Sequence, residues 1–329
     1  MAMFISTPFL VNLLVFVLFP IIYLESFIIL PSNQGRILLS LSSSSSSIRD
    51  EDIKKARTLL PEIVNKMPNS LPQNLKHKYY FLRHGQSTAN IAEIISSSRE
   101  LAYSENHGLT SFGYKQGKES AKQLLDILSE DNNNNNAETG EKQKLVFLSS
   151  PFARAKQTAE ACIDGLMNNK DNQQKIQTMG LTIENEIVFE NSLMERYFGR
   201  LDADSIYTYA YVWPMDAINV THTAFGVESV AAVCTRILQV VERCEEKYDI
   251  TDNTAYHIVW VSHADVLQIG QLYAANAQNV GRFSAYRFKN GEVRAMKFST
   301  DYLPDPVPLE APKRGTSAYT EKVLNTATS

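Results

Sequence analysis

The chain has 329 residues, of which 44% are hydrophobic and 21% are charged, so it can bury one sizeable core and carry appendages. Its formal net charge of −4 excludes a basic footprint, and we expect no nucleic-acid partner. The cysteines Cys162, Cys234 and Cys244 are odd in number and follow no metal-ligand spacing, so they indicate no disulfide framework.

The first segment of the chain is strongly apolar. Residues 1–24 carry no charged side chain and include the run FLVNLLVFVLFPIIYL. Because such a run partitions into a bilayer, we expect residues 1–32 to be a hydrophobic signal or membrane anchor that directs the protein to the secretory pathway or an organelle. A buried core helix is the alternative. Cleavage of the segment and the target compartment stay open.

Low-complexity sequence separates this segment from the expected folded domain. Residues 33–75 contain the run SLSSSSSS and then a short amphipathic helical pattern, and we interpret them as a linker with a short helix. The folded domain is expected over residues 76–300. The proline-rich residues 301–329 lack periodicity and are expected to be a disordered tail.

Within residues 76–300, short apolar runs alternate with helical patterns. The expected strands are YYFLR, LVFLSS, EIVFE, YHIVWVSH, SAYRFK and VRAMKF. This alternation predicts an α/β fold, a three-layer α/β/α sandwich with a mostly parallel central sheet. One helix is expected over about residues 110–129, and the asparagine-rich residues 131–143 that follow are expected to be a disordered loop.

Arg83 and His84 follow the first of these apolar runs. Ligands of parallel sheets bind at the carboxyl ends of the strands, and Gly85 permits a sharp turn with close backbone approach. Taken alone, the tripeptide is better explained by a structural histidine beside a surface arginine, so the functional interpretation depends on other residues.

Arg154 follows the next apolar run, in SSPFARAKQTAE. We expect Ser150 to cap the helix that starts there, with Pro151 at its first position. Arg154 then falls in the first turn, off the buried stripe, where its guanidinium adds bidentate donors to a helix N-terminus that favours anions. An exposed surface arginine is the alternative.

A third apolar run ends in His263, within YHIVWVSHADVLQ. A phosphoryl group suits two histidines and two arginines at such strand ends, because guanidinium groups neutralise its oxygens, one imidazole attacks phosphorus and the other donates a hydrogen bond. A metal would need carboxylate or thiolate partners, and arginines repel a cation. We therefore expect neither a metal nor another cofactor.

The motifs LRHGQSTAN, LTSFGYKQG, SSPFARAKQTAE, LMERYFGRLD and VSHADVLQ, in this order, resemble those of the histidine phosphatase superfamily, in its phosphoglycerate-mutase-like branch. The similarity spans about residues 78–298. It implies a phosphohistidine mechanism with His84 as the nucleophile and Glu195 as the proton donor. The phosphate pocket that the resemblance implies consists of Arg83, Asn90, Arg154 and His263. Ala264 departs from the family pattern, which usually has glycine after the second histidine.

The chemistry of these residue types agrees with the resemblance. A neighbouring cation such as Arg83 favours the neutral form of His84, the form that attacks phosphorus. The leaving alkoxide needs a proton, which a carboxylic acid such as Glu195 can give. Asp265 is the alternative acid, and its structural interpretation is a helix N-cap or first-turn acid that is favourable for the helix dipole.

The expected cap over the site, residues 201–229, is rich in aromatic side chains and contains no Lys or Arg. Mutases of the family carry cations there, which hold a bisphosphorylated intermediate. We therefore interpret the protein as a phosphomonoester hydrolase acting on a small phosphorylated substrate. The alternatives are a phosphoglycerate mutase and a noncatalytic phospholigand-binding or protein-binding module.

Overall fold

The structure is a computed structural model that describes residues 28–30, 37–39, 67–133, 142–248 and 253–308. Contacts divide the chain into residues 1–61 and 62–329. In the first unit, β1 (Ile28–Leu30) and β2 (Ile37–Leu39) pair antiparallel. The rest of the expected targeting segment, most of the linker with its helical pattern, and residues 309–329 of the tail lie outside the described residues.

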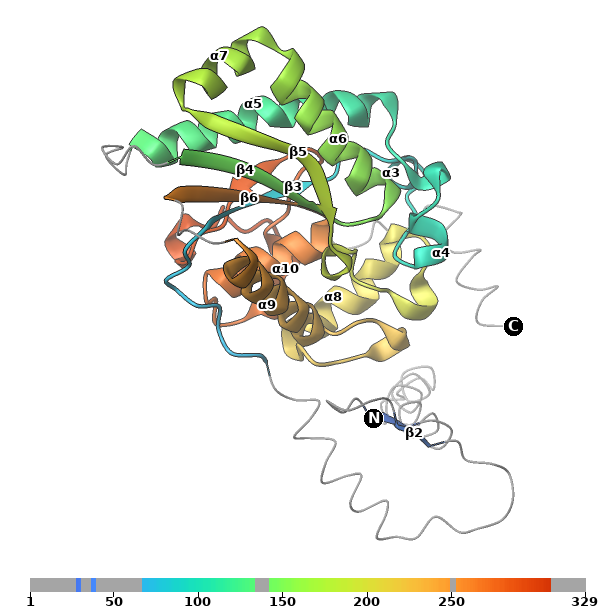
Figure 1. Ribbon diagram of the computed structural model, residues 1–329. Helices are drawn as coiled ribbons and strands as arrows, with labels where there is room; N and C mark the ends of the chain where they lie inside the picture. The colour runs from blue at the N-terminus through green and yellow to red at the C-terminus, as the bar shows by residue number, and fades with distance from the viewer. Residues whose placement is uncertain (1–27, 31–36, 40–66, 134–141, 249–252, 309–329) are drawn as a thin grey trace, which may run out of the picture. The chain divides into compact units, whose positions relative to one another are not determined.

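The second unit contains a sheet with the strand order β5-β4-β6-β3-β7 (Figure 1). The strands are β3 (Lys78–Arg83), β4 (Lys142–Ser149), β5 (Leu181–Phe189), β6 (Thr254–Ser262) and β7 (Val293–Ala295). The pairs β5-β4, β4-β6 and β6-β3 are parallel, and β7 runs antiparallel to β3 at one edge. The expectation of a mostly parallel sheet is confirmed.

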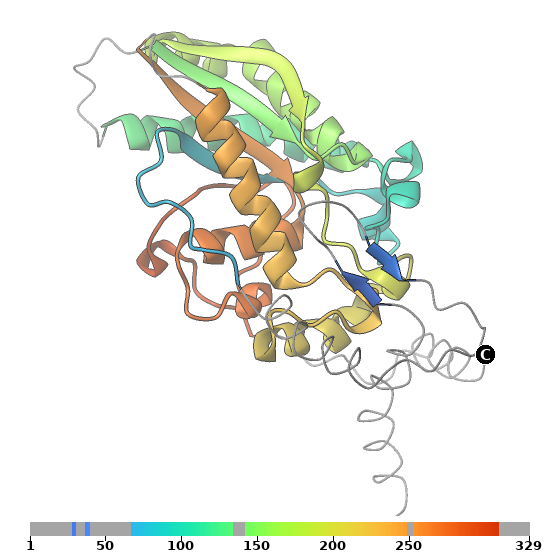
Figure 2. The same cartoon turned by 60° about the horizontal axis from the view of Figure 1, so that its bottom comes forward.

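Helices cover both faces of this sheet, which makes three layers (Figures 1 and 2). The helices α5 (Ser111–Asn133), α6 (Ala153–Asn168) and α7 (Lys170–Thr178) lie on one face, and α9 (Val230–Lys247) and α10 (Ala264–Ala274) lie on the other. Shorter helices are α3 (Thr88–Ile91), α4 (Arg99–Ala102) and α8 (Tyr209–Ile218). The 3-10 helices are Glu105–His107, Asn191–Leu193, Gly199–Leu201, Ile206–Thr208, Ala224–Gly226, Val280–Ala285 and Thr300–Tyr302.

The strand β3 shows why the runs are apolar throughout. Successive side chains point to opposite faces of a sheet. Tyr79 and Phe81 pack into the core beneath α9 and α10, whereas Tyr80 and Leu82 pack into the core beneath α5 and α6. Both faces of β3 are therefore buried, and this strand carries no polar alternation.

One described helical stretch, residues 224–247, is long and apolar enough to cross a membrane, with a mean hydropathy of 1.5. Its main part is α9, whose apolar face packs into the core of the domain. The hydrophobic side chains of α9 are thus accounted for by packing against the sheet. The three cysteines of the chain are free and buried, with Cys234 and Cys244 on this helix.

Two expectations were wrong in part. Residues 131–133 of the expected loop belong to α5 and residues 142–143 belong to β4, whereas residues 134–141 lie outside the described residues. The run SAYRFK is not a strand: its first residues end a 3-10 helix, and residues 286–292 lead as a loop into β7. Backbone groups of this loop serve the site described next.

Candidate active site

The ends of β3, β4 and β6 bring the predicted motifs together. In the parallel register Arg83 is opposite Ser262, and the backbone N–H of His84 donates to the Ser262 carbonyl at 3.0 Å. His263 follows immediately, and the ring centroids of His84 and His263 are 5.2 Å apart. The strand-end histidines therefore share one site, as expected.

Gly85 is required by a close backbone approach. A Cβ atom at this position would lie 2.4 Å from the carbonyl oxygen of Gly113, on α5. The backbone N–H of Gly85 donates to the Thr158 hydroxyl at 3.0 Å, which ties the turn to α6. The turn after β3 is thus fixed by the two helices on that face of the sheet.

The partners of His84 define its tautomer. Its Nδ1 lies 2.7 Å from the carbonyl oxygen of Gly85. Because a carbonyl only accepts, Nδ1 carries the proton and Nε2 keeps its lone pair. Burial, followed by the charges of Arg154 and Arg83, holds the pKa of His84 well below its usual value of 6.5. His84 is therefore a neutral imidazole that is unprotonated at Nε2.

Arg154 lies beside that lone pair. Its Nε donates to Nε2 of His84 at 3.2 Å, and Nη2 donates to the Ser96 carbonyl at 2.8 Å. The side chain is 3% exposed, and burial lowers its pKa to about 10, so it stays charged at neutral pH. Arg154 is in the first turn of α6, as expected, and it is not a surface arginine.

Ser150 does not cap α6, contrary to expectation. The helix begins at Ala153, and its N-cap residue, Phe152, makes no side-chain capping bond. The Ser150 hydroxyl instead lies 2.8 Å from Nε2 of His263 and accepts the N–H of Phe152 at 3.3 Å. With that N–H bound, the hydroxyl can give its own proton to Nε2, which leaves the proton of His263 on Nδ1.

Two buried nitrogens of this site have no hydrogen-bond partner among the described residues: Nδ1 of His263 and Nε of Arg83. Nη1 of Arg83 is held by the carbonyl of Phe288 at 2.6 Å, in the loop before β7. Buried donors without a partner are costly, and an anionic ligand with several oxygens would satisfy both.

Asn90 lies at the start of the short helix α3. Its Oδ1 accepts from the backbone of Ser87 at 3.0 Å and from the amide of Asn290 at 3.3 Å. These bonds fix the amide plane and leave the Asn90 NH₂ group as a donor for the cavity that Asn90 lines. Asn290 also donates to the His84 carbonyl at 3.0 Å, so the loop before β7 supports both residues.

A cavity of about 200 Å³ adjoins these groups, and Glu195 lines it. Its predicted phosphate-site residues are Arg83, His84, Asn90 and Arg154. Further lining residues are Tyr209, Trp213, Asp265, Gln268 and Arg287. Burial raises the pKa of Glu195, although Arg154 and Arg83 oppose the shift. A carboxyl group with a raised pKa therefore lines the same cavity as Arg83 and Arg154.

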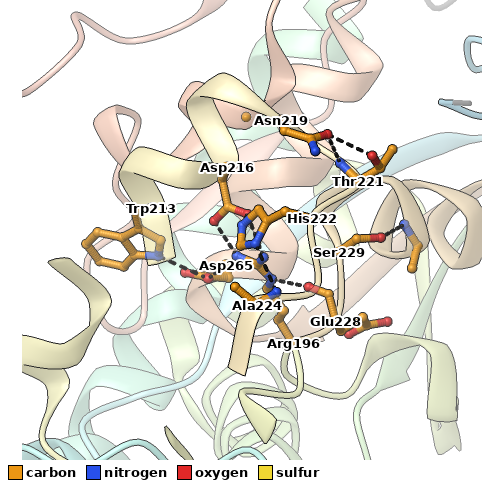
Figure 3. A network of polar contacts seen from close by, with 12 residues as sticks. Arg196, Trp213, Asp216, Asn219, Thr221, His222, Ala224, Glu228, Ser229 and Asp265 are labelled. Carbon is orange, nitrogen blue, oxygen red and sulfur yellow. Dashed lines mark hydrogen bonds and ion pairs between the residues drawn. The ribbon is translucent and has the colours of Figure 1, made fainter. Parts of the chain in front are cut away.

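A buried ion-pair network next to the cavity, which Figure 3 shows, was not predicted from the sequence. Nη1 and Nη2 of Arg196 each donate to the Asp216 carboxylate at 2.7 Å, and both side chains are fully buried. Nε2 of His222 lies 2.7 Å from the same carboxylate. The only signal for it in the sequence was the place of Arg196 next to Glu195 in LMERYFGRLD.

Asp265 joins this network to the cavity. Its Oδ2 accepts from Nε1 of Trp213 at 3.3 Å and lies 3.6 Å from Nη1 of Arg196 (Figure 3). Burial, followed by the nearby charge of Glu195, raises the pKa of Asp265 to about 8. Two carboxyl groups with raised pKa values thus line one cavity, and the alternative acid lies beside the primary one.

Ala264 needs no glycine-like backbone. It is the first residue of α10, and it is not among the residues with positive φ. The cap contributes Ile206, Tyr209 and Trp213 to the cavity, whereas Arg287 contributes a cation from the loop before β7. The cavity therefore has a cation that the composition of the cap does not reveal.

Comparison with known proteins places this geometry in a family. Residues 79–303 match the model of the histidine phosphatase superfamily (branch 1). No curated protein matches the chain.

Similar solved structures share low sequence identity with the chain. The product of an open reading frame of Mycobacterium tuberculosis is 18% identical over 70% of this chain and 96% of its own, with a TM-score of 0.45. Mycobacterial glucosyl-3-phosphoglycerate phosphatase is 16% identical over 67% of this chain and 89% of its own, with a TM-score of 0.46. The alpha-ribazole phosphatase of Shigella flexneri is 16% identical over 71% of this chain and 100% of its own, with a TM-score of 0.44.

Proposed function

The chain belongs to the histidine phosphatase superfamily, and we propose that it is a phosphomonoester hydrolase that acts through a phosphohistidine intermediate. The observation that carries the proposal is the state of His84. Its Nδ1 proton is held by the Gly85 carbonyl, so that Nε2 is unprotonated and its lone pair accepts a hydrogen bond from Nε of Arg154, which the phosphoryl group would replace on binding. A neutral imidazole beside fixed cations suits attack on a phosphoryl group.

In the first step, Nε2 of His84 attacks phosphorus and the P–O bond to the alcohol breaks. Glu195 gives its proton to the departing oxygen, a role that the burial-raised pKa of this carboxyl group favours. Arg83, Arg154 and Nδ1 of His263 donate to the phosphoryl oxygens. Because these donors are already fixed, they cost little reorganisation as charge develops.

In the second step, the Glu195 carboxylate takes a proton from water, whose oxygen attacks the phosphorus of phosphohistidine. The P–N bond breaks, the electron pair returns to Nε2 of His84, and inorganic phosphate leaves. The protonated Glu195 is then ready for the next turnover.

The cap, residues 201–229, contains no Lys or Arg. It therefore lacks cations that could hold a bisphosphorylated intermediate, which favours hydrolysis over mutase chemistry. Arg287 is a cation at the cavity outside the cap. A cavity of about 200 Å³ is smaller than usual for drug-sized ligands, which supports a small phosphorylated substrate. The folded catalytic domain is proposed to span residues 76–300, and the preceding residues to serve delivery.

A panel of phosphomonoesters tests this function. The purified protein should release inorganic phosphate from several small esters. Interconversion of 2- and 3-phosphoglycerate without release of phosphate would favour the mutase. Absence of activity on all esters would favour a noncatalytic binding module. A preparation carrying Gly85→Ala is a useful inactive control, because the added Cβ has no room against Gly113.

A further inference from the structure

The cap carries a sequence signal that catalysis does not use. Asn219-Val220-Thr221 is the only Asn-x-Ser/Thr triplet in the chain. Such a triplet, with any residue except proline in the middle, is the acceptor for N-linked oligosaccharide in proteins that enter the secretory pathway. A single triplet in a chain of this length does not establish a glycosylation site, so the geometry of the triplet also matters.

The triplet forms a turn directly after α8. Oδ1 of Asn219 accepts from the Thr221 backbone N–H at 3.0 Å and from the Thr221 hydroxyl at 2.7 Å (Figure 3). These bonds hold the amide plane and use only its oxygen. Asn219 is exposed, and Nδ2 has no hydrogen-bond partner among the described residues. The nitrogen that would carry a sugar is therefore accessible and fixed in direction.

The neighbouring residue leaves apolar surface in solvent. Ile218, the last residue of α8, is 88% exposed, the largest exposed fraction among the described large hydrophobic side chains. An oligosaccharide on the next residue would cover this side chain, because N-linked sugars are bulky and solubilising.

We propose that Asn219 is an N-glycosylation site. Nδ2 of Asn219 forms a bond to the anomeric carbon of an oligosaccharide carried on a lipid pyrophosphate. The bond between that carbon and the pyrophosphate oxygen breaks, the lipid pyrophosphate leaves, and one amide proton goes to a base of the transferring enzyme. The proposal rests on the expected delivery by residues 1–32 and is independent of the phosphatase activity.

The sugar would not close the active site. Trp213 lines the cavity, and Asn219 follows it by six residues, which is about 9 Å along a helix axis. Trp213 is half-buried whereas Asn219 is exposed, so they face different surroundings. We therefore expect the glycosylated and sugar-free proteins to have the same kcat and KM on a soluble ester.

The test uses the full-length chain produced in a eukaryotic cell with an intact secretory pathway. Peptide N-glycosidase should increase the gel mobility of the wild-type protein, and mass spectrometry should locate the modified residue at Asn219. Thr221→Ser, which keeps a hydroxyl in the triplet, should retain the sugar. Thr221→Ala should lose it.

Asn219→Asp is the matched variant. It keeps the oxygen that Thr221 contacts and removes the nitrogen acceptor. It also has the same polypeptide sequence as the wild type after enzymatic sugar release, which converts Asn219 to Asp. The variant should show no mobility shift, and its thermal unfolding should coincide with that of the deglycosylated wild type.

Three results would overturn the proposal. The first is a full-length wild-type protein without sugar, whether or not it enters the secretory pathway. The second is a sugar that persists in Asn219→Asp, because the modified residue would then lie elsewhere. The third is a sugar that persists in Thr221→Ala, because the triplet would then not direct the modification.

Discussion

The hydroxyl oxygen of Ser150 and Nε2 of His263 lie 2.8 Å apart, although 113 residues separate them in the sequence. The Phe152 N–H occupies one acceptor position of the hydroxyl, which favours donation from the hydroxyl to Nε2. We therefore expect the proton of His263 on Nδ1, and Ser150 to act as a positioning residue for His263 in the proposed mechanism.

Replacement of Ser150 by alanine should lower kcat about tenfold, the usual worth of one hydrogen bond. The loss arises because Nε2 of His263 can then hold the proton, which deprives Nδ1 of it. Ser149→Ala is the control, since the Ser149 hydroxyl is buried and its only bond within the described part of the chain goes to the Ser150 carbonyl. Equal activity losses in both variants would show that Ser150 has no special effect on His263.

Replacement of Glu195 by glutamine should slow hydrolysis of alkyl phosphates by about 10² to 10⁴, the typical contribution of a general acid. The loss on p-nitrophenyl phosphate should be far smaller, because nitrophenolate leaves without a proton. This comparison concerns the first step, phosphorylation of the enzyme, which appears as a burst of nitrophenolate before the intermediate is hydrolysed. Rapid-mixing kinetics on both esters make the comparison. Equal losses would reassign the acid, and Asp265→Asn would then be the next variant to measure.

Asp265 should make the stability of the domain depend on pH. Its pKa is raised from 3.8 to about 8 in the folded protein, so the folded state binds more protons than the unfolded state between these values. The stabilisation from this proton is complete below about pH 4 and is lost as pH rises through about 8. Urea unfolding from pH 5 to 9 should show a decline in the wild type that is shallower in Asp265→Asn. Parallel curves would contradict the assignment.

Replacement of Arg196 by methionine should destabilise the fold by about 3–5 kcal/mol, because it leaves the Asp216 carboxylate buried without its cation. Chemical denaturation measures the effect. Arg99→Met, at an exposed position on α4, is the control and should change stability by less than about 0.5 kcal/mol. A small effect at Arg196 would mean that His222 alone can compensate Asp216.

Much of the sheet and of the candidate site could be predicted from the sequence because strong local signals mark both. The runs ending in Arg83 and His263 are apolar on both faces, and parallel strands bring their ends to one edge. The structure places the predicted pocket residues there, while their catalytic roles stay predictions.

The rest depends on contacts between distant residues, which local patterns do not encode. Ser150 looked like a helix cap because it precedes proline at a strand end, but its partner is 113 residues away. SAYRFK looked like a strand because it is rich in aromatics. It forms a loop whose carbonyl groups at Tyr286 and Phe288 accept bonds from Gln271 and Arg83.

Labelling of the phosphorylated enzyme, stopped with an alkaline denaturing quench, tests the central claim most directly. The wild-type protein, mixed briefly with a radiolabelled phosphomonoester, should carry a label that is stable in base and lost in acid, as a phosphohistidine is. His84→Ala should fold with an unchanged far-ultraviolet spectrum and carry no label. A label of the same stability on His84→Ala would contradict the account, because the nucleophile would then be another residue.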